Sequence, residues 1–135
     1  MKNKLKHAIP IILGVIMLAG AVGHLVVPRE YAPMIPAFIP QDFANIMAAI
    51  AEGLVAFGLF IPKYRKYGGL GFMGLMFVFL PIHVWDLVRE EPYLGSATAA
   101  YLRLVVQFLF IYAGWWIYKT SSTLPSDQSP PPEPQ

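Results

Sequence analysis

The sequence predicts an all-α fold, an integral membrane four-helix bundle with both termini cytoplasmic. Three observations predict it. The 135 residues are 56% hydrophobic and only 13% charged, which is about half the charge of an ordinary soluble domain. Four apolar runs each reach the roughly 18–20 residues that a helix needs to cross the hydrocarbon core. The basic residues gather in alternate segments between those runs, which is the bias that orients helices in a membrane.

Each apolar run predicts one transmembrane helix, because a backbone within lipid must pair all its polar groups internally. In chain order the predicted helices cover residues 9–27, 43–61, 70–88 and 97–118. The polar residues within them are few: His24 in the first, Asn45 and Glu52 in the second, His83 and Asp86 in the third, and Arg103 and Gln107 in the fourth. These spans make up a single domain, residues 1–119.

The charges beside the spans predict their orientation. Basic residues cluster before the first helix, between the second and third, and after the fourth: Lys2, Lys4, Lys6, Lys63, Arg65, Lys66 and Lys119. The other two connecting segments carry one arginine each, beside four acidic residues. By the positive-inside bias, both termini and the 62–69 segment are cytoplasmic. We therefore expect a multi-pass protein of the inner membrane of a bacterium.

The two ends of the chain need separate interpretation. The basic start, the apolar stretch and the small residues Ala19-Gly20-Ala21 also fit a signal peptide with a cleavage site. The apolar run continues to Val27, however, and this length favours a retained helix. Residues 120–135 are rich in proline and serine without apolar periodicity, which predicts a disordered tail.

The composition excludes several function classes. The chain has no cysteine, which excludes disulfides, thiol relays, iron–sulfur clusters and cysteine-based zinc sites. The net charge of +2 gives no argument for a nucleic-acid partner, so the lipid bilayer is the expected surrounding. Haem between His24 and His83 is disfavoured, and no metal site is predicted, because two histidines without further spacing signals are a weak constellation. No spacing matches a catalytic mechanism, so catalytic residues stay unassigned.

The polar residues of the spans concentrate in their outer halves. At 1.5 Å per residue, His24 lies about 4–5 Å below the outer helix end, Arg103 about 9 Å and Glu52 about 13 Å. Ionisable groups inside a span cost about 2.5–3.5 kcal/mol and normally face the bundle interior or a wet cavity. We therefore predict an outward-facing polar pocket with the ligand-binding residues His24, Glu52, His83, Arg103 and Gln107.

Several roles are open within this pocket. Glu52, the deepest acid, is expected to pair with Arg103, the intramembrane residue that always stays charged. Arg103 would anchor an anionic or carbonyl group, while Glu52 would donate a hydrogen bond or exchange a proton. A purely structural Glu52–Arg103 pair is the alternative. Asp86 and Asn45 lie near helix ends and are interpreted as interfacial residues, and Gln107 as either a ligand contact or an interhelical hydrogen bond.

Prolines shape two segments near the pocket. The outer segment 28–42 contains four prolines, which forbid a regular helix, yet it keeps five large apolar residues. Two interpretations stay open for it, a stiff connector or a lid over the pocket. Pro81 is expected to kink the third helix before His83 and to free the carbonyl near Phe77.

Motifs spread over residues 9–118 carry a family resemblance. They are Gly20 with His24-x-x-x-Pro28-x-x-Tyr31, Met34-Ile35-Pro36-Ala-x-Ile39-Pro40, Ala51-Glu52-Gly-Leu with Gly58 and Pro62, Phe79-Leu-Pro81, and Leu102-Arg103-Leu-x-x-Gln107 with Trp115-Trp116. With these motifs the chain resembles the DoxX-like family of small four-helix bacterial membrane proteins. One departure is Pro81-Ile-His83-Val, where relatives commonly show Pro-Ala-Asn-Ile, so His83 inherits no role from that asparagine.

The resemblance implies architecture first and chemistry second. The family takes its name from an association with quinone-linked oxidation of sulfur compounds, so quinone is the cofactor class that it suggests. Its bundle is similar in outline to the EXPERA sterol-binding group and to the vitamin K epoxide reductases. The latter depend on cysteine pairs, so quinone redox here would need an external electron donor. Three functions stay open: binding of a small hydrophobic or quinone-like molecule, a membrane subunit of a quinone-linked oxidoreductase with redox partner proteins, and a non-catalytic membrane scaffold.

Overall fold

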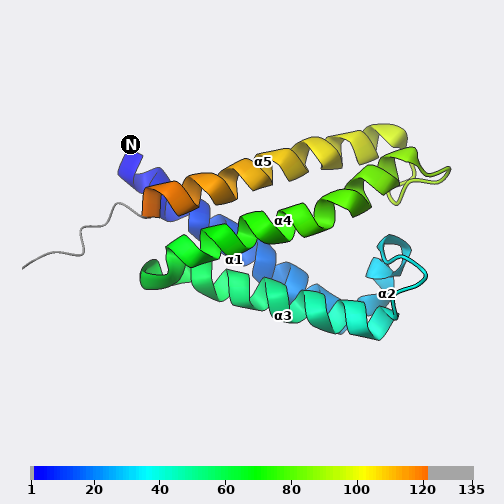
Figure 1. The fold of residues 1–135 in the computed structure, drawn as a ribbon, viewed down its shortest axis with the longest axis horizontal. Coiled ribbons are helices and arrows are strands. Elements are labelled where there is room, and N and C mark those ends of the chain that lie inside the picture. The colour runs from blue at the N-terminus through cyan, green and yellow to red at the C-terminus, as the bar shows by residue number, and fades with distance from the viewer. Residues whose placement is uncertain (1, 122–135) are drawn as a thin grey trace, which may run out of the picture.

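A computed structural model describes residues 2–121 as a bundle of helices (Figure 1). The elements in chain order are α1 (Lys2–Val26), α2 (Pro28–Tyr31), the 3₁₀ helix η1 (Ala32–Met34), α3 (Gln41–Phe60), the 3₁₀ helix η2 (Pro62–Tyr64), α4 (Arg65–Val88) and α5 (Ala97–Ser121). No strand occurs within residues 2–121. The helices α1, α3, α4 and α5 are long and apolar enough to cross a membrane. The prediction of an all-α, four-helix membrane bundle is therefore confirmed.

The helices are longer than the predicted apolar spans. α1 begins at Lys2 rather than at residue 9, and α4 begins at Arg65 rather than at residue 70. Hydropathy identifies only the part of a helix that lies in hydrocarbon. The polar turns that extend a helix into the interface are therefore not predicted by it. α5 runs through Thr120 and Ser121, which were expected in the disordered tail. The Thr120 hydroxyl donates to the Trp116 carbonyl oxygen at 2.9 Å. The remaining tail prediction, 122–135, lies outside the described residues.

The connecting segments divide between the two ends of the bundle. The start of α1, the end of α5 and η2 lie at one end, and α2, η1 and the 89–96 segment lie at the other (Figure 1). The segments with most of the basic residues therefore share one end. Which face of the membrane this end meets stays a prediction.

The helix α3 is central to the packing. It packs against α1 and against α4, and α4 packs against α5, whereas α1 barely contacts α5. Close approach at two of these contacts depends on glycine, because a Cβ at Gly68 would meet the Gly58 backbone and one at Gly114 would meet the Gly69 carbonyl. The buried apolar core lies towards the end that holds the termini, and it comprises Leu13, Met17, Ala56, Leu59, Phe72, Met76 and Ile117. The buried polar side chains Asn45, Glu52 and Asp86 lie nearer the other end of the bundle.

The proline-rich outer segment corrects one expectation. Its prolines were expected to forbid a regular helix, yet the segment forms the single turn α2 and the 3₁₀ turn η1. Pro28 and Pro33 stand in the first turn of these elements, where a missing N–H has no helical partner to lose. Residues 35–40 contain no helix, so the prolines limit the helices without preventing them.

Candidate functional site

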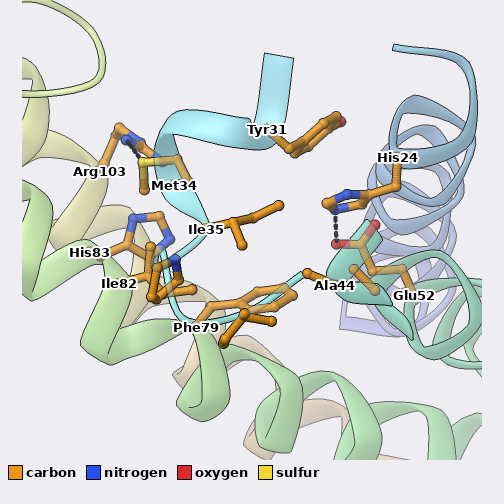
Figure 2. Close-up of a pocket in the computed structure, with 13 residues that line it drawn as sticks. His24, Tyr31, Met34, Ile35, Ala44, Glu52, Phe79, Ile82, His83 and Arg103 are labelled. Carbon is orange, nitrogen blue, oxygen red and sulfur yellow. Dashed lines mark hydrogen bonds and ion pairs between the residues drawn. The ribbon is translucent and has the colours of Figure 1, made fainter. Parts of the chain in front are cut away.

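A cavity of about 280 Å³ lies at the end of the bundle that holds α2 and η1 (Figure 2). Four predicted site residues line it: His24 from α1, Glu52 from α3, His83 from α4 and Arg103 from α5. All four spans therefore contribute to one site, as their polar residues predicted. The fifth predicted residue, Gln107, does not line this cavity.

Apolar side chains form most of the cavity wall. Ala44 and Ala48 of α3 face Phe79 and Ile82 of α4 across it. The segment between the first two spans adds a further wall with Tyr31, Met34, Ile35, Pro36 and Ile39. Of its two interpretations, the structure favours the lid, because this segment covers the cavity.

Glu52 lies beside a histidine and not beside an arginine. Its Oε1 is 3.7 Å from His24 Nε2, and both side chains are almost fully buried. The expected Glu52–Arg103 pair is wrong, because Arg103 Nη1 contacts Asp86 Oδ2 at 2.7 Å. The packing explains the difference: α3 lies against α1 while α4 and α5 form their own pair. Glu52 and Arg103 consequently face each other from opposite walls (Figure 2).

His24 is held in one orientation by Asn45 and Tyr31. Its Nδ1 lies 2.8 Å from Asn45 Oδ1, and Asn45 Nδ2 donates to the Pro28 carbonyl oxygen at 3.4 Å. The Tyr31 ring packs on the imidazole at 3.8 Å between centroids, tilted by 30°. Asn45 lies near the start of α3 and is 3% exposed, so it is buried within the bundle. Burial, followed by the charge of Glu52, raises the pKa of Tyr31 above its usual value, so its hydroxyl stays protonated at neutral pH.

Two glycines of α1 make room for this arrangement. A Cβ at Gly20 would collide with Glu52 Oε2, and a Cβ at Gly23 would collide with the Tyr31 hydroxyl. The Glu52 carboxyl group therefore packs directly against the α1 backbone at Gly20. Its Oε2 is buried and has no hydrogen-bond partner among residues 2–121.

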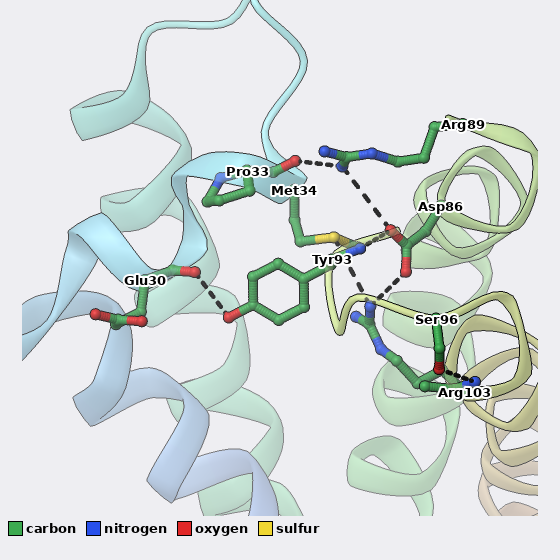
Figure 3. Close-up of polar contacts among 9 residues, drawn as sticks. Glu30, Pro33, Met34, Asp86, Arg89, Tyr93, Ser96 and Arg103 are labelled. Atoms are coloured by element: carbon green, nitrogen blue, oxygen red, sulfur yellow. Dashed lines mark hydrogen bonds and ion pairs between the residues drawn. The ribbon is translucent and has the colours of Figure 1, made fainter. Parts of the chain in front are cut away.

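A second polar cluster is centred on Asp86 (Figure 3). Asp86 lies two residues before the end of α4, and it is 1% exposed, so this residue near a helix end is buried within the bundle. Its Oδ1 accepts a hydrogen bond from the Tyr93 main-chain N–H at 2.8 Å. Arg103 contacts its Oδ2, as described above, and Arg89 Nη1 lies 3.8 Å from Oδ1. One buried carboxylate therefore holds α4, α5 and the segment that joins them.

The Asp86 cluster also reaches the proline-rich segment. Arg89 Nη1 donates to the Pro33 carbonyl oxygen at 2.8 Å, and the Tyr93 hydroxyl donates to the Glu30 carbonyl oxygen at 2.9 Å (Figure 3). Arg103 Nη1 lies 3.8 Å from Met34 Sδ. These contacts fix the wall that covers the cavity. Nothing in the sequence indicates the Arg89 and Tyr93 hydrogen bonds, because their acceptors are main-chain carbonyls that any residue would supply.

Most of the chain matches a known family profile. Residues 13–118 match the sequence profile of a domain of unknown function, DUF8561. The chain belongs to this family. No curated protein and no solved structure matches it. The DUF8561 domain includes every residue that lines the cavity and every residue of the Asp86 cluster.

The remaining predicted residues lie between α4 and α5. Gln107 Nε2 donates to the Met76 main-chain carbonyl, next to Phe77, whose carbonyl lacks its usual donor at Pro81. This supports the interhelical role of Gln107. Gln107 also lines a second cavity of about 370 Å³, and His83 and Arg103 line both this cavity and the first. His83 Nδ1 is buried without a partner in the described part of the chain.

The site can therefore offer hydrogen bonds from two walls with an apolar space between them. One wall carries the His24–Glu52 pair and the other carries His83 beside the neutralised Arg103. Within residues 2–121, no group of three or more histidines, cysteines and acids is placed to hold a metal ion.

Proposed function

We propose that this protein binds a small, largely apolar molecule in the cavity beneath α2 and η1. The cavity itself carries the proposal: about 280 Å³ of space, apolar side chains on most sides and a few buried polar atoms. A dry engineered cavity of about 150 Å³ is enough to bind benzene. Concave, mostly apolar sites with few polar groups are typical of small-molecule binding.

The unpartnered atoms support a ligand with polar groups. Glu52 Oε2 and His83 Nδ1 have no hydrogen-bond partner within residues 2–121. Leaving a buried polar atom unpaired costs about 1–3 kcal/mol, and a polar group of a ligand beside each residue would offset part of that cost. Because Glu52 and His83 lie on opposite walls (Figure 2), a flat molecule with a polar group at each end, such as the reduced, hydroxyl-bearing form of a quinone, suits the cavity.

The charges favour a neutral ligand over an anion. Arg103 was expected to anchor an anionic group, but Asp86 neutralises it at 2.7 Å. Its guanidinium also lies 5.2 Å from the Tyr93 ring centroid, so its contacts are with the protein. The proposal therefore assigns Arg103 to the wall of the site and leaves ligand binding to His24, Glu52 and His83.

The family resemblance, the type of membrane and the side to which the cavity opens are proposed from the sequence. Membership of the DoxX-like family, residence in a bacterial inner membrane and an outward-facing cavity follow from the motifs and the charge bias. A membrane subunit of a quinone-linked oxidoreductase is the form of this proposal in which the ligand is a quinone and a partner protein supplies electrons. A scaffold would need no ligand at all.

Native mass spectrometry of the full chain in mild detergent, followed by lipid extraction, tests the proposal. Ala48→Phe fills the cavity from α3. Leu54→Phe is the matched control, since it enlarges a side chain of the same helix that is 68% exposed. We expect wild type and Leu54→Phe to retain a small molecule that Ala48→Phe loses while melting at the same temperature. Equal retention of the molecule by all three proteins would contradict the proposal. If wild type retains no small molecule, the proposal is also contradicted and the scaffold is favoured.

A further inference from the structure

The His24–Glu52 pair has a defined hydrogen-bonding pattern towards the cavity. Asn45 Nδ2 donates to the Pro28 carbonyl oxygen, which leaves Asn45 Oδ1 as the acceptor for His24 Nδ1. His24 Nδ1 therefore carries a hydrogen. The other ring nitrogen, Nε2, lies 3.7 Å from Glu52 Oε1, which is beyond the roughly 2.7–3.2 Å of a direct N–H···O hydrogen bond. Both residues line the cavity.

Charge balance calls for one hydrogen between the two groups that face each other, His24 Nε2 and the Glu52 carboxyl. A bare carboxylate beside a neutral imidazole would be an uncompensated buried charge, which is strongly unfavourable. The proton can sit on His24 Nε2, facing an ionised Glu52, or on the Glu52 carboxyl, facing the Nε2 lone pair. In either arrangement the pair presents one donor and one acceptor side by side. The pattern offered to a ligand is the same in both.

We infer that the ligand of this cavity is a lipophilic alcohol or phenol whose hydroxyl group binds between His24 Nε2 and Glu52 Oε1. The inference rests on the proposed function and names the chemistry of its ligand. A hydroxyl both donates and accepts, so it complements the pair in both proton arrangements. Hydrogen bonds of about 2.7–3.0 Å allow one hydroxyl oxygen to reach two atoms that are 3.7 Å apart.

Other polar groups match less well. A carbonyl or ether oxygen only accepts, an ammonium group only donates, and each leaves one member of the pair unsatisfied. A carboxylate only accepts and adds a negative charge beside Glu52. The opposite wall offers no compensation, because Asp86 holds Arg103. Phe79 and Ile82 line the cavity from α4, on the same helix as His83, and suit the apolar body of the molecule.

Three probes that differ only in their polar end test this inference: 4-propylphenol, 4-propylanisole and 4-propylbenzoate. Their binding to the full chain in lipid nanodiscs is measured by titration calorimetry, and heat from partition into lipid is subtracted with the blocked variant Ala48→Phe. The phenol should bind at least about tenfold more tightly than the anisole, since losing the donor leaves a buried acceptor unpaired. The benzoate should bind most weakly.

Variants of the pair give the decisive comparison. Glu52→Met and His24→Phe each remove one half while keeping a side chain of similar length or the ring packed on Tyr31. Either variant should lower the phenol-to-anisole ratio to about one, and Leu54→Phe should keep the wild-type ratio. If the anisole or benzoate binds wild type as tightly as the phenol does, the inference is overturned and the proposed function stands. If no probe binds, both are overturned.

Discussion

Replacing Asp86 by asparagine should destabilise the bundle more than replacing any exposed acid. Asparagine keeps the shape of the side chain, and its Oδ1 can still accept from the Tyr93 main-chain N–H. What disappears is the negative charge 2.7 Å from Arg103. Removing one member of a buried ion pair costs about 3–5 kcal/mol. Because the Arg103 side chain is 24% exposed and can be partly hydrated, we expect the lower end, about 3 kcal/mol.

The two partners of Asp86 should respond differently. Arg103→Gln leaves a carboxylate that is 1% exposed with its nearest cation gone, so we expect the upper end, about 4–5 kcal/mol. Arg89→Gln removes a longer contact of 3.8 Å from a side chain that is 23% exposed, and Arg103 still lies 2.7 Å from Asp86 in this variant, so we expect a cost of about 0–1 kcal/mol. The double variant Asp86→Asn/Arg103→Gln should cost less than the sum of its single changes, because no uncompensated charge remains.

Reversible unfolding in mixed detergent micelles, followed by circular dichroism, measures these differences. Asp42→Asn is the matched control, since Asp42 is an exposed acid in the first turn of α3. An Asp86→Asn variant as stable as Asp42→Asn would refute the reasoning, and so would Arg89→Gln proving more costly than Arg103→Gln. Strict additivity in the double variant would show that the two groups do not interact.

Three further predictions concern packing, polar satisfaction and orientation. Gly20→Ala should displace the carboxyl group seated on α1 and lower the unfolding midpoint, whereas Gly53→Ala, whose added Cβ would meet nothing within 4 Å, should leave it unchanged or raise it. Gln107→Leu should cost about 0.5–1.5 kcal/mol in the same unfolding assay, because it removes the hydrogen bond that the Gln107 side chain donates from α5 to the Met76 carbonyl of α4; an unchanged stability would show that this bond does not hold the two helices together. Since the chain has no cysteine, single cysteines at Ser96 and Lys63 report orientation: an impermeant maleimide added to intact cells should label the first and spare the second, and the reverse would place the termini outside.

The sequence was sufficient to predict where the four spans lie, but it was not sufficient to predict the residues at which the helices begin and end. Apolar runs predict how much of a helix lies in hydrocarbon, so the middles of all four helices are correct. Helix ends depend on hydrogen bonds in polar turns, and so the start of α4 at Arg65 and the end of α5 at Ser121 could not be predicted from hydropathy. Pro28 shows the same limit, because a proline that ends one helix can begin the next.

For the site, the depth of each polar residue was predictable but its partner was not. Depth follows from the position of a residue along its own helix, and it correctly brought His24, Glu52, His83 and Arg103 to one cavity. Pairing depends on which helices are neighbours and on the rotation of each about its axis. Glu52 and Arg103 were a reasonable pair by charge alone. The packing of α1 on α3 and of α4 on α5 gave each a different partner.

This division of partners determines what kind of site the bundle forms. With Glu52 beside His24 and Arg103 beside Asp86, each helix pair neutralises its own charges, and the space between the pairs needs no ion to balance it. At the far end of the bundle α3 and α4 are joined by η2 and by a glycine contact. At the cavity end the two pairs are joined by hydrogen bonds from the Arg89 and Tyr93 side chains to main-chain carbonyls of the 28–40 segment. Cutting the Arg89–Pro33 and Tyr93–Glu30 hydrogen bonds would therefore loosen the covering wall without exposing a buried charge. A molecule that enters between the pairs replaces apolar contacts with apolar contacts, and the selectivity of the site must come from the few polar atoms that the helices leave unpaired.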